Sequence, residues 1–454
     1  MEDVSTEGVE VLRGDHRKAI VTLAVPLGVA ILMQQLNNVV DSFWVSSLGA
    51  APLAAVGVVY PIYAIMIGLG NGLGIGSSSA ISRDIGRRDR ESAERTAMQS
   101  LVLVLAVSVP VGVVLALSAE PLFVAIGGGD IIGECLDYGL PLFVCAPVIL
   151  LSGMLSGMLR GEGAAKRSMY MQVCGAGLNM VLDPLMINVL GMGVSGAAWA
   201  TSISFAVSCA VALLWYVRRK GMYVRLNRGY VRPEKRIVRD ILSVGLPESM
   251  ELCVMSVFNV FLNIFVLACG GEGSLAIFSA SWRIFYILMV PAQCLGGALV
   301  NVASTEMGMG RPDIVRDAFR YAAVVAFVAL VAGSVALAVL NGPVAAAFTG
   351  SPDLLPFRDE FSGLILCFCL FLPVMSFIYT GSSLMQGIDR ATGAMVNTLA
   401  RNILLLASFA LVTATTASTW DLWIATTVVE IFGGFMMLAH ATVSLSRVVG
   451  KPMR

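Results

Sequence analysis

Five acidic residues lie inside long apolar stretches of a chain of 454 residues that is 57% apolar and only 13% charged. They are Asp41, Asp183, Glu248, Glu251 and Glu430. A carboxylate near the centre of a membrane costs roughly 3 kcal/mol or more, so each needs a partner or a function. Carboxylate oxygens bind hard cations such as Na⁺, and a desolvated carboxyl group can instead carry H⁺. The residues predict a site for a small cation inside a membrane protein.

Asp183 has the best local support for such a site. Asn179 lies four residues earlier and therefore on the same helix face. Pro184 follows directly and frees the carbonyl group of Met180 from its helical hydrogen bond. Thr201, in the next apolar stretch, adds a hydroxyl group if the two stretches pack as a hairpin. The alternative is that Asp183 only caps a broken helix or pairs with an arginine, but its depth favours a function.

Asp41 ends a polar stripe on the first apolar stretch. Gln34, Asn37, Asn38 and Asp41 follow the i, i+3, i+4, i+7 spacing of one helix face. Such a stripe faces a wet cavity, or forms a hydrogen-bonded seam with a neighbouring helix. Pro26 lies about four turns before Asp41, nearer the cytoplasm, and lets this helix bend.

The other acids are weaker candidates. Glu248 and Glu251 follow Pro247 at the start of an apolar stretch, where acids often serve the helix dipole. Glu251 lies slightly deeper and is the better candidate for coupling, with Arg283 as a partner for one of the two acids. Glu430 lies in the last apolar stretch, where we expect it to face the interior of the second half.

Two further side chains suit a cavity that binds organic molecules. Tyr138 is either an interfacial aromatic residue or a cavity residue. Met33 has the adaptable side chain of a promiscuous binding surface. The chain has no metalloprotease, serine hydrolase or nucleotide-binding motif, which argues against an enzyme. The sequence indicates no cofactor. Because it has no nucleotide-binding motif, an ion gradient would have to drive any transport.

Small residues recur at four-residue spacing in two of the apolar stretches. This spacing allows the close packing of membrane helices. The pairs and the triplet are Gly70/Gly74, Gly72/Gly76 and Gly153/Gly157/Gly161.

The apolar runs predict an all-α polytopic membrane protein with twelve transmembrane helices. Their ranges are 18–45, 51–80, 96–118, 134–159, 168–189, 194–217, 238–268, 274–303, 317–341, 359–385, 394–416 and 420–446. Of the 30 basic residues, 27 lie in alternate loops or in the termini. Basic loops stay in the cytoplasm, so we expect both termini to be cytoplasmic in a multi-pass protein of the cell membrane.

The two halves of the chain repeat one another. Val25-Pro26 recurs as Leu246-Pro247, and Ile85-Gly86 recurs as Met307-Gly308. Six spans in each half give a parallel repeat, with two pseudo-symmetric six-helix lobes around a central cavity. The predicted parts are an N-lobe at 1–217, a basic cytoplasmic linker at 218–237 and a C-lobe at 238–454.

The sequence resembles the multidrug and toxic compound extrusion (MATE) transporters over almost its whole length, and looks most like their prokaryotic, archaeal-like branch. The resemblance rests on the order and spacing of several motifs and on their repetition. These motifs are Pro26 to Asp41, Leu53-Ala54-Ala55-Val56-Gly57, Leu159-Arg160-Gly161-Glu162-Gly163, Asn179-x-x-x-Asp183-Pro184 and Gly196-Ala197-Ala198-Trp199-Ala200-Thr201.

The resemblance implies two lobes that rock between inward-open and outward-open states. It implies an ion-coupling site in the N-lobe formed by Asp41, Asn179, Asp183, Thr201 and the backbone of Ala197. It also implies that Pro26 is a gating bend and that Gln34, Asn37 and Tyr138 bind substrate. Members of another branch have a coupling acid in span 7, where this chain has Met255.

The predicted function is therefore Na⁺- or H⁺-coupled antiport that exports amphipathic organic compounds. The expected partners are a small organic substrate, a coupling cation and the lipid bilayer, with no nucleic acid, and the chain is expected to be a monomer. A flippase for a lipid-linked precursor is the alternative, although it needs more basic residues in the cavity than Arg283 and Arg401. A passive channel is a weaker alternative, because the acids do not form a symmetric ring.

Overall fold

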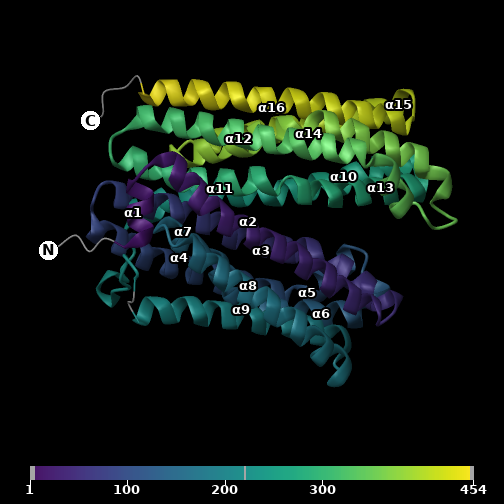
Figure 1. The fold of residues 1–454 in the computed structure, drawn as a ribbon. Helices are drawn as coiled ribbons and strands as arrows, with labels where there is room; N and C mark the ends of the chain where they lie inside the picture. The colour runs from purple at the N-terminus through teal and green to yellow at the C-terminus, as the bar shows by residue number, and fades with distance from the viewer. Residues whose placement is uncertain (1–5, 219–220, 450–454) are drawn as a thin grey trace. The chain divides into compact units, whose positions relative to one another are not determined.

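A computed structural model describes residues 6–218 and 221–449, and every regular element in these ranges is helical. Figure 1 labels the elements. The α-helices are α1 (Glu7–Arg13), α2 (His16–Ser46), α3 (Ala50–Gly86), α4 (Arg90–Leu117), α5 (Ala119–Ala125), α6 (Ile132–Val144), α7 (Ala146–Gly161), α8 (Ala165–Pro184), α9 (Gly193–Arg218), α10 (Lys235–Leu288), α11 (Val290–Gly308), α12 (Pro312–Val339), α13 (Asn341–Phe348), α14 (Arg358–Gly387), α15 (Ala391–Thr415) and α16 (Thr419–Val449). Short helical turns complete the set: η1 (Gly129–Ile131), η2 (Leu185–Val189), η3 (Arg228–Tyr230) and η4 (Leu355–Phe357).

The helices in the described ranges agree with the predicted twelve-span layout. Nine single helices are long and apolar enough to cross a membrane, and α6 with α7 forms a tenth span that bends by 52°. Helix α10 is 54 residues long, more than twice the roughly 20 residues that one span needs. Gly271 breaks it with a φ of 69°, so its second part continues into α11 as a separate span. Among the described helices, α8 does not meet this test of length and apolar character, and in the predicted layout it is the twelfth span.

The chain divides into two compact units. Unit 1 comprises residues 1–253 and 304–311, and unit 2 comprises residues 254–303 and 312–454. The unit boundaries therefore fall inside α10, inside α11 and between α11 and α12. The predicted division into an N-lobe, a linker and a C-lobe follows the sequence repeat instead, and it stays a prediction.

Helices α3 and α7 form the most extensive contact between two helices of unit 1. A Cβ atom added at Gly74 would lie 2.4 Å from the carbonyl oxygen of Gly153, and one added at Gly157 would lie 2.1 Å from that of Gly74. At these distances no larger side chain fits, so the backbones touch directly. The prediction of close packing at small residues is confirmed for this pair of helices.

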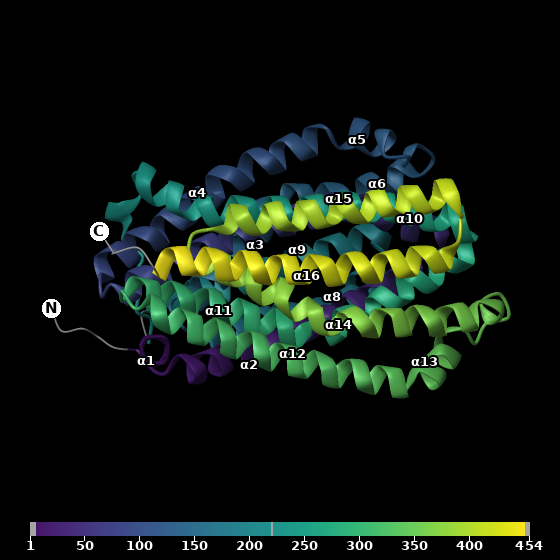
Figure 2. The ribbon, with the colours of Figure 1, turned by 90° about the horizontal axis from the view of Figure 1, so that it is seen from above.

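Unit 2 is built around α14. Helices α12 and α16 both pack closely on α14 but touch each other only slightly. In Figures 1 and 2 these three helices run side by side through the green and yellow part of the chain. Aromatic side chains of α10 and α14 fill part of the core, where the ring centroids of Phe285 and Phe368 are 4.4 Å apart.

The segment 221–234, which lies between α9 and α10, is held against the helices of unit 1 by two buried side chains. Glu162, which is 2% exposed, accepts hydrogen bonds at Oε2 from the backbone N–H groups of Tyr223 and Val224, at 3.0 and 3.2 Å. Gln99 donates from Nε2 to the carbonyl oxygen of Tyr230 at 2.8 Å and accepts at Oε1 from the N–H group of Glu234 at 3.0 Å. The segment is therefore fixed at both of its ends.

The docking at Glu162 should depend on pH. Burial raises the pKa of this carboxyl group to about 7, although hydrogen bonds from Val224, Tyr216 and Tyr223 and the charge of Arg167 act in the opposite direction. In the undocked state the pKa returns to the ordinary value of about 4.5. Between about pH 4.5 and 7, docking of the segment is accompanied by protonation of Glu162. The fraction of molecules with the segment docked therefore falls as the pH rises through this range.

We expect protection of the Tyr223 and Val224 amides from hydrogen exchange, corrected for intrinsic rates, to fall by up to roughly tenfold per pH unit between about pH 4.5 and 7. In Glu162→Gln, which keeps a hydrogen-bond acceptor but cannot ionise, this dependence should vanish. Equal protection of the wild type at pH 5 and pH 7 would contradict the argument.

Candidate functional site

A hydrogen-bonded chain of three polar side chains joins α2 to α8 in unit 1. Asn37 Nδ2 donates to Asn179 Oδ1 at 2.8 Å, and Asn179 Nδ2 donates to Asp183 Oδ1 at 2.9 Å. Asn179 is 3% exposed and Asp183 is fully buried. The spacing on α8 that predicted a shared face for Asn179 and Asp183 is thus confirmed, and Asn37 of α2 is bound to the same cluster.

The local fold explains how these groups come together. Helix α8 packs along α2 on one side and along α9 on another, so the predicted hairpin of spans 5 and 6 is present. Pro184 ends α8, and the chain continues as the π-helix Leu185–Val189. Asp183 therefore lies at an irregular turn, and it is close enough to Asp41 of α2 for their charges to interact.

Three oxygen atoms of this cluster are buried without a hydrogen-bond partner in the described part of the chain. They are Oδ1 of Asn37, Oδ1 of Asp41 and Oδ2 of Asp183. Unsatisfied buried acceptors are uncommon in proteins, because each loses its hydration without compensation. All three are hard oxygen ligands, and two belong to carboxylates. This donor set fits a small cation such as Na⁺, or a proton shared with a carboxylate.

Tyrosines lie near the acidic side of the cluster. Tyr138 of α6 is 4% exposed, and its hydroxyl group is within electrostatic range of Asp41, Asp183 and Tyr63. The structure therefore places Tyr138 in the interior of unit 1 near the site. Tyr63 of α3 is a neighbour that the sequence analysis missed, and its three-residue spacing from Tyr60 on one helix face is the signal that could have indicated it.

For the other residues predicted at this site, the described part of the structure gives the degree of burial but no hydrogen bond to the cluster. Gln34 is exposed on α2 and Met33 is half-buried, while Pro26 is buried inside a helix that continues through it. On α9, Ala197 is fully buried and Thr201 is half-buried. Within the described residues, no hydrogen bond joins either of these two to an aspartate. Their roles stay predictions.

The acids near the start of α10 have charged neighbours in unit 1. Glu248 is half-buried and lies close to Glu251 and to Arg160 of α7. Arg283 belongs to unit 2, so its predicted pairing with Glu248 or Glu251 stays a prediction.

Glu430 faces the interior of unit 2, as expected, and it has a partner that the sequence did not indicate. Arg401 Nη1 of α15 donates to Glu430 Oε2 of α16 at 3.0 Å, and both side chains are less than 10% exposed. Arg401 Nη2 also donates to Asn402 Oδ1 at 3.3 Å. A buried charge that is paired and hydrogen-bonded in this way is already neutralised.

The internal repeat allows the ion-site residues of α8 to be compared with the corresponding residues of α15. Helices α15 and α16 each begin 226 residues after α8 and α9. With this offset, Leu405 and Phe409 correspond to Asn179 and Asp183, and both are buried apolar side chains. The buried oxygen cluster of unit 1 therefore has no counterpart on α15.

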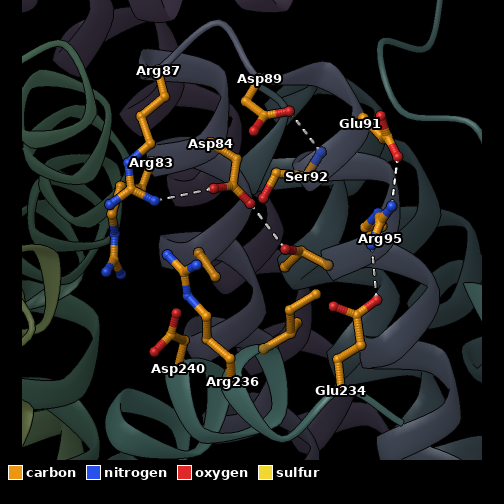
Figure 3. A pocket seen from close by; sticks show the side chains of 13 residues that line it. Arg83, Asp84, Arg87, Asp89, Glu91, Ser92, Arg95, Glu234, Arg236 and Asp240 are labelled. Carbon is orange, nitrogen blue, oxygen red and sulfur yellow. Dashed lines mark hydrogen bonds and ion pairs between the residues drawn. The ribbon is translucent and has the colours of Figure 1, made fainter. Parts of the chain in front are cut away.

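A separate cavity of about 480 Å³ lies between the ends of α3, α4 and α10 in unit 1 (Figure 3). Ion pairs occupy much of its charged lining. Arg95 bonds Glu91 at 2.6 Å and Glu234 at 3.2 Å. Asp84 accepts from Thr96 at 2.9 Å and from Arg87 at 3.4 Å. These pairs hold the turn between α3 and α4 against the start of α10.

Comparisons with known proteins agree with this arrangement. The sequence profile of the MatE family matches residues 26–185 and 247–412. The multidrug export protein MepA of Staphylococcus aureus strain MSSA476 is 24% identical over 411 residues, which is 89% of each chain. MepA of Staphylococcus saprophyticus is 28% identical over 283 residues, and this match spans 62% of each chain.

Solved structures are similar over nearly the full length. A MATE crystal structure in complex with MaL6 has a TM-score of 0.95 and 32% identity, covering 98% of this chain and 100% of the other. A MOP superfamily transporter from Pyrococcus furiosus, described as having a binding pocket of reverse polarity, has a TM-score of 0.94, 32% identity and the same coverage.

The match to the MatE profile covers well over half of the sequence, in two segments that reproduce the internal repeat. The chain belongs to the MatE family and is a multi-pass membrane transporter of the multidrug and toxic compound extrusion class, rather than an enzyme.

Proposed function

We propose that this transporter exports amphipathic organic compounds in exchange for Na⁺ or H⁺, and that the cation binds at Asp41, Asn179 and Asp183. The observation that carries the proposal is the group of three buried oxygen atoms on Asn37, Asp41 and Asp183 that have no hydrogen-bond partner. A cation there would satisfy acceptors that the described protein groups leave unsatisfied. Thr201 and the carbonyl group of Ala197 are proposed as further ligands on α9.

Coupling requires that the ion and the substrate prefer different states of the same element. Helix α2 is that element in our proposal. It carries Asp41 for the ion, and Met33, Gln34 and Asn37 for the substrate, with Tyr138 across from it. Because Asn37 is bonded to Asn179, a movement of α2 that accommodates substrate also changes the ion site.

Pro26 is the proposed bending point of α2. Its ring removes one backbone hydrogen bond, so the helix bends there at lower cost than elsewhere. Related solved structures include MATE in a straight conformation and in a bent conformation, with TM-scores of 0.94 and 0.92 to this chain. Another is a MATE P26A mutant.

Drug export is proposed from the relatives, which include the multidrug export protein MepA. Two observations favour an ion site in unit 1 alone. Leu405 and Phe409 replace its key residues in the second half, and Arg401 neutralises Glu430. The pairing of Arg401 also leaves few basic groups for the pyrophosphate of a lipid-linked precursor, which disfavours the flippase.

We propose that the protein acts as a monomer in the cell membrane with both termini in the cytoplasm. This orientation is proposed because loops rich in basic residues stay in the cytoplasm. A tag at either end should therefore be accessible to a protease only after cells are permeabilised.

Proteoliposomes that hold a fluorescent organic cation test the function. A Na⁺ gradient and a pH gradient are imposed separately, and the rate of dye movement is measured for each. If the protein is an antiporter, one of the two ion gradients should drive the dye against its own concentration gradient. The other ion gradient should have little effect on the rate of dye movement. Dye movement that neither gradient changes would contradict ion coupling.

A further inference from the structure

Helices α12, α14 and α16 of unit 2 enclose a groove that the transport mechanism does not use. Its cavity volume is about 380 Å³. The groove exists because α12 and α16 both pack on α14 and barely touch each other. Figures 1 and 2 show the three helices side by side along the outer part of the ribbon of this unit.

The floor and walls of the groove are apolar. Phe327 of α12 stacks on Phe377 of α14 with ring centroids 5.4 Å apart and planes 6° apart. Phe377 in turn lies 6.0 Å from Phe435 of α16. Phe319 and Leu445 continue the apolar lining towards one end. Stacked aromatic rings of this kind make a rigid surface against which a flexible hydrocarbon chain packs.

Two arginines lie at that same end. Arg316 and Arg320 line the groove, are exposed, and stand one helical turn apart on α12. Among the residues that the structure describes, neither guanidinium group has an ion pair or a hydrogen bond. The nearby acids of α12, Asp313 and Asp317, do not line the groove, so an occupant meets only the positive charges.

The distance from charge to aromatic floor fits one membrane leaflet. From Arg316 to Phe327 the helix rises about 16 Å, at roughly 1.5 Å per residue. Half of the hydrocarbon thickness of a bilayer is about 15 Å. The arginines therefore stand at headgroup level when the phenylalanines lie near the ends of the acyl chains, on the side of the membrane where the basic loops gather.

We propose that this groove binds one anionic phospholipid, with an acyl chain on the Phe327 and Phe377 rings and the phosphate against Arg316 and Arg320. Charge complementarity selects this occupant, because basic pockets between transmembrane helices on the side of the basic loops suit anionic headgroups. The groove is separate from the proposed ion site, which belongs to unit 1.

Native mass spectrometry of the full, delipidated chain tests the proposal. The protein is titrated with dioleoyl phosphatidylglycerol and, separately, with dioleoyl phosphatidylcholine. We expect preferential binding of one phosphatidylglycerol. In the double variant Arg316→Ala/Arg320→Ala this affinity should fall roughly 30-fold, since each arginine near a headgroup contributes about fivefold. Thr442→Phe, which fills the groove and keeps both arginines, should weaken both lipids.

The control is Arg232→Ala/Arg239→Ala, which removes two exposed positive charges from unit 1 and should leave binding unchanged. Excess glycerol phosphate should not compete, because it lacks an acyl chain. Full competition by glycerol phosphate would show a phosphate site rather than a lipid site and would overturn the proposal. Unchanged phosphatidylglycerol binding in Arg316→Ala/Arg320→Ala would overturn it as well.

Discussion

Asp183→Asn is expected to lose ion-driven export almost completely, by roughly 100-fold or more, which is near the upper end of typical coupling free energies. The substitution removes one negative charge and little volume. The Oδ1 atom of the new side chain can still accept the hydrogen bond from Asn179, so the link between α2 and α8 is kept. What disappears is the charge that holds a cation among the buried oxygens.

The measurement is dye efflux from proteoliposomes with the driving gradient on and off. The matched control is Asp137→Asn, the same change at an exposed carboxylate on α6. Asp183→Asn should have wild-type expression and thermal stability, and a residual rate that the gradient does not alter. Gradient-driven efflux at the wild-type rate in Asp183→Asn would rule out the proposed ion site, whatever the result for drug binding.

The sequence was most informative where one helix carries the whole pattern. The four-residue spacing of Asn179 and Asp183, the break after Pro184 and the polar stripe up to Asp41 are all local, and the structure confirms the spacing and the break. The twelve spans were also predictable, because membrane crossing demands long apolar runs within a single segment.

Contacts between helices were much harder to predict. The partner of Arg401 is Glu430 on the next helix, 29 residues away, and helical periodicity does not say which faces of two helices meet. Tyr63 reaches the neighbourhood of Asp41 from a third helix. The groove at Arg316 depends on how three helices space themselves around α14.

The glycine motifs are an exception, because they predict a contact between helices from local sequence. A small residue at every fourth position leaves a flat strip along one face of a helix. Such a strip allows the backbone of another helix to pack closely against it. The structure confirms this for α3 and α7, where the carbonyl group of Gly74 lies against Gly157. The same strip makes the transporter vulnerable to substitution there.

Gly74→Leu is therefore expected to prevent stable folding. A Cβ atom at this position would lie 2.4 Å from the carbonyl oxygen of Gly153 and 3.1 Å from its carbonyl carbon. Both belong to the backbone of α7, so no side-chain rotation relieves the overlap and the helices must separate. Overpacking a well-filled core typically costs about 1–3 kcal/mol, and the cost here should be at least at the upper end of that range.

Gly57→Leu is the matched control, because it makes the same change on the same helix at a position with nothing within 4 Å of the added Cβ atom. Thermal unfolding and size-exclusion chromatography in detergent are compared for the two variants. We expect Gly57→Leu to behave as the wild type, and Gly74→Leu to aggregate or to unfold at least several degrees lower. If both variants unfolded at the wild-type temperature, the contact between α3 and α7 would be loose enough to admit a leucine. The buried cluster at Asp183 would then need another support, because α3 and α7 form the most extensive packing in the unit that contains it.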